Sequence, residues 1–169
     1  MIEVKHLTKK YGSGVAVSDL SFKVESGKIY GFLGPNGAGK STTMNIIAGC
    51  LAPTEGQVLI GGYDICEEPD EAKRLIGYLP EQPPLYPDMT PEEYLTFVGR
   101  AKGLRGAELH EEIEYVMDAT CIGGMRSRLI KNLSKGYKQR VGIAQAMLGS
   151  PEIIILDEPT VGLDPRQII

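Results

Sequence analysis

Hydrophobic and polar residues alternate near the start of the chain, as they do in strands with one buried face. The alternation over residues 20–25 predicts a strand, and Ser26 and Gly27 predict the turn that follows it. Residues 28–33 form an apolar, β-prone run that ends in a glycine cluster, so a further strand is expected there. Apolar residues then recur at helical spacing over residues 40–51, which predicts a helix.

The middle of the chain predicts short strands, a stiff loop and a block of helices. Residues 57–60 and 75–79 are candidate strands, and the five prolines from Pro80 to Pro91 predict a loop. Thr90 and Glu93 have the spacing of a capping box at the start of a helix. Helices are expected from there to about Lys102, from about Ala107 to Ala119 and from about Ser134 to Leu148.

Residues 153–156 are four consecutive aliphatic residues, which predicts a strand buried on both faces. The order of elements is therefore strands, one helix, strands, a helical block and a buried strand. This order is typical of an α/β fold with a helical insertion. No internal repeat divides the chain, so we expect a single domain over residues 1–169, with residues 84–150 as the inserted helical subdomain.

Composition adds limits on the class of protein. The chain has 169 residues, of which 42% are hydrophobic and 24% are charged. These values are typical of a soluble globular protein whose core needs no disulfide or metal ion to stabilise it. Its three cysteines are widely spaced and argue against a disulfide framework, which favours a reducing cytosol. No apolar run approaches 18 residues and no signal-peptide pattern opens the chain, so we expect neither secretion nor a membrane span.

Charge is segregated, although the formal net charge is only -4. Residues 64–93 contain nine acidic side chains, whereas residues 123–140 contain six basic side chains and no acidic one. Two interpretations remain open at this point. The two segments are either solvated faces of opposite charge, or the basic segment helps to gather a phosphorylated ligand.

One glycine-rich segment carries specific chemistry. It satisfies the pattern G-x-x-x-x-G-K-[ST] between a predicted strand and a predicted helix, which is the context that a phosphate-binding loop requires. Glycines let backbone N–H groups curl around a polyphosphate, and the helix N-terminus adds partial positive charge. Lys40 can reach the β- and γ-phosphates and the Ser41 hydroxyl can hold Mg²⁺. The segment consists of Gly34, Pro35, Asn36, Gly37, Ala38, Gly39, Lys40 and Ser41.

Two carboxylates follow the predicted buried strand, at its C-terminal end, where ligands of open α/β sheets gather. Asp157 would support the Mg²⁺ shell, and Glu158 would orient or deprotonate an attacking water. Adjacent residues of a strand point to opposite faces, so the two acids need a turn to share one site. Pro159 directly after them favours that turn.

The motif at residues 133–140 resembles the signature of the ABC ATPases, the nucleotide-binding subunits of ABC transporters. The resemblance covers essentially the whole chain, because the other motifs of the family occur in the same order. It implies a P-loop NTPase fold with a RecA-like core, an N-terminal antiparallel β-subdomain and an inserted helical subdomain. It also implies ATP and Mg²⁺ as ligands. The motifs are Tyr11, the loop at 34–41, the loop at 80–84, the signature, the acids at 157–158 and Gly162 to Pro165.

The resemblance also implies roles for single residues. Tyr11 would stack on adenine, and Thr42 would continue the phosphate site. Ser134 and Gly136 would touch the γ-phosphate of ATP held by a second subunit, in a head-to-tail homodimer or pseudo-dimer, and Asp164 would cross that interface. The family has a glutamine that meets Mg²⁺ and the lytic water; Gln82 is favoured for this role over Glu81, which stands at the usual position.

Besides Glu81 at the glutamine position, two further departures from the family pattern accompany the resemblance. Lys135 and Tyr137 stand where a glycine and a glutamine are common, which leaves their contacts open. The switch histidine of the family would follow the Asp164 loop, and neither His6 nor His110 is placed to replace it. The expectation is a chain truncated within the C-terminal part of the core, with a gap in its sheet and impaired hydrolysis.

The sequence thus predicts an ATPase subunit that couples ATP hydrolysis at a dimer interface to transport through separate transmembrane permease subunits. It would lie in the cytoplasm against the inner face of the membrane. Residues 77–81 resemble those of ABC-2 exporters, which hints at outward transport. A soluble ABC ATPase of translation or DNA repair and an inactive nucleotide-binding module are the alternatives. No nucleic acid is expected as a partner.

Overall fold

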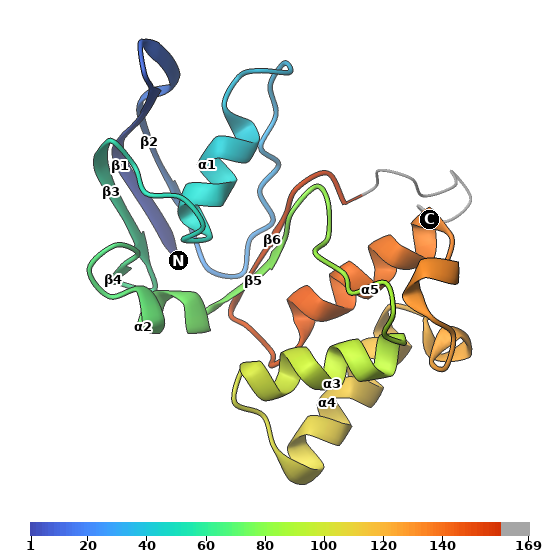
Figure 1. Cartoon of the computed structure of the whole chain (residues 1–169). Coiled ribbons are helices and arrows are strands. Elements are labelled where there is room, and N and C mark those ends of the chain that lie inside the picture. The colour runs from blue at the N-terminus through green and yellow to red at the C-terminus, as the bar shows by residue number, and fades with distance from the viewer. Residues whose placement is uncertain (160–169) are drawn as a thin grey trace. The chain divides into compact units, whose positions relative to one another are not determined.

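The computed structural model describes residues 1–159, which belong to two units (Figure 1). The first unit is Met1–Ile76 and the second begins at Gly77. Each unit contains both helices and strands, so the α/β class predicted from the sequence is confirmed.

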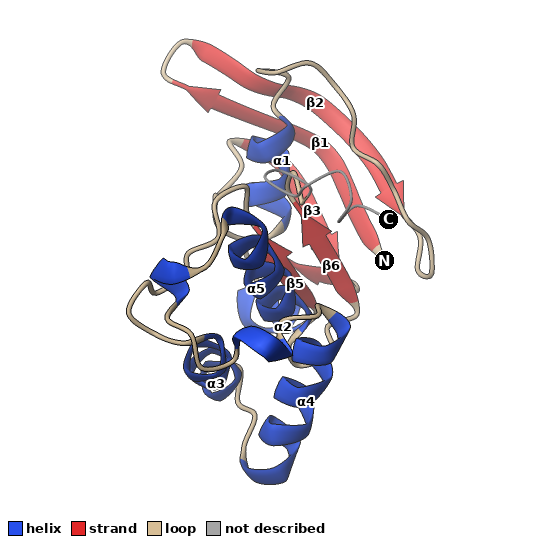
Figure 2. Cartoon of the chain, turned by 90° about the vertical axis from the view of Figure 1, so that its right-hand side faces the viewer, coloured by secondary structure: helices blue, strands red, loops and turns tan. Residues whose placement is uncertain are grey.

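The first unit is built on an antiparallel sheet in the order β2-β1-β3-β4, of which Figure 2 labels β2, β1 and β3. The alternation predicted over residues 20–25 is confirmed within β2, where Phe22 pairs with Val4 and Val24 pairs with Ile2. The alternate apolar side chains are partly buried, and the polar ones between them are exposed. The strands are β1 (Ile2–Tyr11), β2 (Gly14–Val24), β3 (Glu55–Ile60) and β4 (Tyr63–Asp64).

Helix α1 (Lys40–Ile47) packs against β2 and β3 and buries Thr43, Ile46 and Ile47 (Figure 1). Its position agrees with the helix predicted from residue 40. Helix α2 (Pro69–Arg74) was not predicted from the sequence. It has six residues, of which only Ala72 is buried, so it leaves no periodic apolar pattern to read.

The strand predicted over residues 28–33 is wrong. The segment is irregular, and Ile29 and Leu33 are almost fully exposed. The Phe32 ring packs near the sheet, where its centroid lies 5.8 Å from that of Phe22 in β2. A β-prone run forms a strand only when a neighbouring strand takes up its N–H and C=O groups. No strand within residues 1–159 pairs with this segment.

The turn after β4 is held by the Asp64 carboxylate, which accepts hydrogen bonds from the amide of Cys66 at 2.8 Å and from Nε2 of Gln57 at 2.7 Å. Partial burial raises the pKa of Asp64, but these bonds and one from the amide of Glu67 outweigh it and lower the pKa below its usual value. A carboxyl with a lowered pKa stabilises the fold at neutral pH, and this stabilisation is lost as the pH falls through the folded pKa.

Asp64→Asn is therefore expected to lower the free energy of unfolding at pH 7 by up to about 1 kcal/mol, because the turn is near the surface. The difference from the wild type should shrink as the pH falls below about 4. Urea unfolding between pH 7 and pH 3 measures it, with Glu67→Gln as a matched control whose carboxylate takes part in no hydrogen bond of the turn. A difference that stays constant over this range would contradict the assignment.

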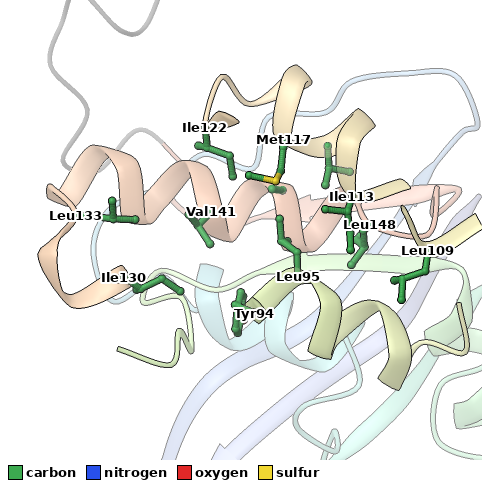
Figure 3. Packing of buried hydrophobic residues seen from close by; sticks show 12 residues of the cluster. Tyr94, Leu95, Leu109, Ile113, Met117, Ile122, Ile130, Leu133, Val141 and Leu148 are labelled. Atoms are coloured by element: carbon green, nitrogen blue, oxygen red, sulfur yellow. The ribbon is translucent and has the colours of Figure 1, made fainter. Parts of the chain in front are cut away.

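The second unit is formed around three helices and a buried apolar cluster (Figure 3). The helices α3 (Pro91–Ala101), α4 (Gly106–Ala119) and α5 (Lys135–Met147) match the three predicted from the sequence. Two 3₁₀ turns, η1 (Gly123–Met125) and η2 (Ile130–Asn132), connect α4 to α5. The cluster takes residues at helical spacing from each helix, such as Leu95, Ile113 and Val141.

Helix caps fix where α3 and α5 begin. The Oγ1 atom of Thr90 accepts a hydrogen bond from the amide of Glu93, and the Glu93 carboxylate accepts one from the amide of Thr90. This is the capping box that the sequence predicts. Ser134 caps α5, with Oγ accepting from the amide of Tyr137 at 3.3 Å. Both starts agree with the sequence because a cap depends on residues within one turn.

Strands β5 (Ile76–Leu79) and β6 (Ile153–Leu156) form a two-stranded sheet. β6 confirms the strand predicted at 153–156, but the prediction that both of its faces are buried is wrong. Ile154 is 47% exposed, and the other three residues are only partly covered. Burial of a strand depends on layers that pack over it, which four aliphatic residues cannot reveal.

Helix α5 approaches β5 so closely that Gly77 has no room for a side chain. An ideal Cβ at this position would lie 1.9 Å from the Ala146 carbonyl oxygen and 2.9 Å from Cγ of Pro151. Because the first contact is with backbone, it cannot be relieved by a change of rotamer. Backbone would have to shift instead.

Gly77→Ala is accordingly expected to lower the free energy of unfolding by about 2–3 kcal/mol. Gly123→Ala is the matched control in the same unit, because a Cβ at that position would meet nothing within 4 Å. Urea denaturation of the two variants tests the contact. Equal stability of both variants would show that α5 does not lie this close to β5.

Candidate functional site

Two glycines with positive φ shape the phosphate loop. Gly37 and Gly39 have φ values of 84° and 81°, in the left-handed region that favours glycine. A Cβ at Gly39 would also lie 2.4 Å from the carbonyl oxygen of Ala16 in β2. The loop therefore passes against the sheet where only glycine fits, and it delivers the chain directly into α1.

The start of α1 presents backbone amides that no side chain among residues 1–159 caps. Its N-cap is Gly39, which has no capping side chain, and the first turn contains no acidic residue. The N–H groups of Lys40, Ser41 and Thr42 have no acceptor within the helix, because the first residues of any α-helix lack one. Amides of this kind, together with the positive end of the helix dipole, bind anions.

The Lys40 ammonium group lies over the same loop. Its Nζ donates hydrogen bonds to the carbonyl oxygens of Gly34 at 2.8 Å and Pro35 at 2.9 Å. A compact cation held beside uncapped amides is the donor set that a polyphosphate needs, so these residues fit the phosphates of ATP. The Ser41 side chain is exposed at this helix start and supplies an oxygen of the kind that Mg²⁺ accepts.

Tyr11, the residue proposed to stack on adenine, ends β1 in the same unit. Its side chain is 55% exposed, and the Lys9 ammonium lies 5.3 Å from the centre of its ring. The ring is therefore presented on the surface rather than used in the core. An exposed aromatic face is suited to stacking.

The acids at the end of β6 point to different environments. Asp157 is buried, with 3% of its surface exposed, and its amide donates to the Leu79 carbonyl of β5 at 2.9 Å. Glu158 is exposed and has a φ of 49°. The chain thus turns at Glu158, as Pro159 suggested from the sequence. The arrangement provides one sheltered carboxylate and one accessible carboxylate in adjacent positions.

Glu81 and Gln82 follow β5 in the proline-rich loop, and both side chains are exposed. Both lie directly after β5, the strand that pairs with β6. Residues 81–82 and the acids at 157–158 therefore follow two neighbouring strands of one sheet.

The signature motif opens helix α5. Ser134 and Lys135 are exposed at its first turn, whereas Gly136 is buried. Tyr137 packs against the apolar cluster, and the Arg140 guanidinium lies 5.8 Å from the centre of its ring. Tyr137, which replaces the common glutamine, is thus a packing residue. Lys135, which replaces the common glycine, adds a cation to the exposed start of the helix.

The basic segment at 123–140 is partly neutralised within the second unit. Arg126 forms ion pairs with Glu114 and Glu92, and Lys131 pairs with Asp88 at 2.8 Å. The interpretation of the whole segment as a free basic face is therefore too simple.

Asp164 lies outside the residues that the structure describes.

Residues 17–161 match the family model described as ABC transporter. The chain belongs to the ABC transporter family of ATP-binding proteins. It is 41% identical over 165 residues to the probable multidrug ABC transporter ATP-binding protein YbhF of Escherichia coli K12. It is 38% identical over 166 residues to the linearmycin resistance ATP-binding protein LnrL of Bacillus subtilis 168. Both alignments cover 98% of this chain, but only 28% of YbhF and 53% of LnrL.

A solved structure of an ABC cassette supports the same assignment. It is titled as a dimeric post-hydrolysis state of the ATP-binding cassette MJ0796 bound to ADP and Pi. The two structures agree with a TM-score of 0.89 at 30% identity, over 99% of this chain and 78% of the other. The ABC ATPase fold predicted from the sequence is confirmed by this likeness. In the part of the chain that the structure describes, no helix has the length and apolar character that crossing a bilayer requires.

One residue in the signature helix was missed by sequence reasoning. Gln139 is buried to 4% exposure in α5, although glutamine is usually a surface residue. The sequence does show that Gln139 shares one side of the helix with Gly142 and Ala146, which lie three and seven residues later. A polar residue among small residues on one helix face is unusual. Its burial follows from tertiary packing, which the motif does not show.

Proposed function

We propose that the chain binds ATP with Mg²⁺ and hydrolyses its γ-phosphate as the ATP-binding subunit of an ABC transporter. The observation that carries the proposal is the start of α1, which no side chain of the described residues caps and whose Lys40 ammonium bonds to the carbonyls of the phosphate loop. Family membership and the cassette bound to ADP and Pi support the choice of nucleotide.

The proposed roles follow from chemistry already described. Residues 34–42 hold the phosphates through their amides and Lys40, and Ser41 contributes to the Mg²⁺ shell. Bound Mg²⁺ would neutralise charge on the phosphates. Asp157 supports that ion, and Glu158 acts as the general base because its carboxylate is accessible to water. Gln82 orients the water, with Glu81 as the alternative.

We propose that two ATPase subunits act together, with Ser134 and Gly136 of one facing the ATP of the other and with Asp164 at the interface. The dimeric cassette with which this chain shares its fold supports this arrangement. Residues 84–150 would then form the inserted helical subdomain, which presents the start of α5 to the partner. The start of α5 carries the positive end of the helix dipole and exposes Ser134 and Lys135, which suits a γ-phosphate.

The membrane partner is proposed to dock on residues 81–97. Tyr86 and Phe97 are 48% and 47% exposed there, and their ring centroids lie 5.5 Å apart. Exposed aromatic pairs are common at protein interfaces. The subunit would thereby lie at the inner face of the membrane and drive transport, and the resemblance of residues 77–81 to ABC-2 exporters favours the outward direction. Neither relative's name refers to translation or DNA repair.

Nucleotide binding and phosphate release test the proposal directly. We expect the purified chain to bind a fluorescent ATP analogue in a Mg²⁺-dependent manner, and ATP to displace it. Release of phosphate should follow on addition of ATP and stop when Mg²⁺ is chelated. Failure to bind any nucleoside triphosphate would rule the proposal out.

A further inference from the structure

Gln139 lies in the signature helix α5 with 4% of its surface exposed. Its side-chain nitrogen Nε2 is fully covered and finds no hydrogen-bond partner among residues 1–159. A buried amide donor without an acceptor costs free energy, and native proteins keep few such groups. The position therefore needs an acceptor that residues 1–159 do not supply in this arrangement.

The face of α5 that carries Gln139 packs on β5 and the loop after it. Ala146 meets Gly77 on this face, and Gly142 lies so close to Pro83 that a Cβ there would be 2.9 Å from its Cγ atom. Residues spaced by three and four share one side of a helix, so Gln139 belongs to the same face. Ala146 meets Gly77 whereas Gly142 meets Leu79 and Pro83, so α5 and this segment run in opposite directions. Gln139 is one helical turn nearer than Gly142 to the start of α5, at the end of the face that meets the proline-rich loop.

This loop offers acceptors rather than donors. Pro80, Pro83 and Pro84 have no N–H group, whereas each residue has a carbonyl oxygen. The Pro83 carbonyl accepts from the amide of Leu85 at 2.8 Å, and the Pro84 carbonyl accepts from the hydroxyl of Tyr94 at 3.5 Å. Burial raises the pKa of Tyr94 to about 12, so that hydroxyl remains a donor at neutral pH.

The carbonyl oxygens of Glu81 and Gln82 accept no main-chain hydrogen bond in the described part of the chain. We infer that Gln139 is a positioning residue, whose Nε2 donates to a main-chain carbonyl of residues 81–82 when the loop takes its nucleotide-bound position. The inference rests on the proposed function, in which Gln82 serves the nucleotide. It makes the position of Gln82 depend on the helix that begins at Ser134.

Hydrogen exchange measured by mass spectrometry tests this inference without relying on turnover. The chain is compared with and without Mg²⁺ and a non-hydrolysable ATP analogue. In the wild type, exchange should slow about ten-fold both in the phosphate loop and in the peptide that contains Gln82 and Leu85. Gln139→Met, which keeps the volume and removes the donor, should lose only the second effect.

Gln145→Met is the matched control, because Gln145 also lies in α5, nearer its C-terminal end, and its covered side-chain oxygen has no hydrogen-bond partner among the described residues. It should retain both effects. Gln139→Leu is a second donor-free variant in case Gln139→Met loses the phosphate-loop effect through misfolding, and thermal unfolding of each variant identifies that case. Thermal stability of the Gln139 variants should equal or exceed that of the wild type, because an unsatisfied donor is removed.

The outcomes separate this inference from the proposed function. The inference is overturned if a folded Gln139 variant retains the wild-type slowing in the Gln82 peptide. It is also overturned if that peptide never responds in the wild type while the phosphate loop does, and the proposed function then stands. If neither segment of the wild type responds to the nucleotide, the proposed function itself fails.

Discussion

Replacing Glu158 with glutamine is expected to lower ATP turnover by about 10²- to 10⁴-fold while leaving ATP affinity within a few-fold of the wild type. Glutamine has nearly the same shape as glutamate, but it cannot accept a proton from water. Glu158 is exposed at the turn that follows β6, and the neighbouring Asp157 is sheltered. The loss should therefore fall on the chemical step and not on phosphate binding.

Two measurements follow from this expectation. Phosphate release at saturating ATP and Mg²⁺ reports the turnover, and light scattering after gel filtration reports whether the variant with trapped ATP dimerises more strongly. Glu152→Gln is the matched control, since Glu152 is an exposed acid at the entry to β6. Unchanged turnover in Glu158→Gln would mean that another residue activates the water.

Lys40→Met is expected to weaken ATP binding by about ten- to hundred-fold, because a charge-assisted hydrogen bond contributes about 1.5–3 kcal/mol. Among residues 1–159, Nζ of Lys40 bonds to the loop carbonyls of Gly34 and Pro35, so nucleotide binding is expected to exchange those partners for phosphate oxygens. The effect should be larger for ATP than for AMP, which lacks the β- and γ-phosphates.

Competition with a fluorescent ATP analogue measures this change. Lys28→Met is the control, because Lys28 is an exposed lysine in the irregular segment that leads to the loop. It should bind ATP as the wild type does. Equal loss in both variants would indicate a general effect of net charge, and the assignment of Lys40 to the phosphates would then be wrong.

The features that the sequence predicted well depend on short stretches of chain. The capping box at Thr90, the cap at Ser134 and the helix start at Lys40 each rest on residues within one or two turns. The strand expected at 28–33 failed because strand formation needs a partner far along the chain. The burial expected at 153–156 failed for a related reason, since the covering layer is not encoded in the strand itself.

In the candidate site, too, features set by neighbouring residues could be predicted from the sequence, whereas features set by distant residues could not. The phosphate loop could be predicted because its glycines and its lysine occur at fixed spacing within eight consecutive residues. The turn that separates Asp157 from Glu158 was suggested by Pro159 and is present. Gln139 could not be predicted, because its significance depends on a covered nitrogen that lacks an acceptor.

The central claim is that the amides around residues 34–42 hold the phosphates of ATP while the acids at 157 and 158 prepare its hydrolysis. A crystal structure of the Glu158→Gln protein with ATP and Mg²⁺ tests this most directly. The account predicts phosphate oxygens on the amides and Lys40, and Asp157 within reach of the magnesium shell, at most roughly 5 Å away. A nucleotide bound elsewhere, or Asp157 beyond that reach, would contradict it.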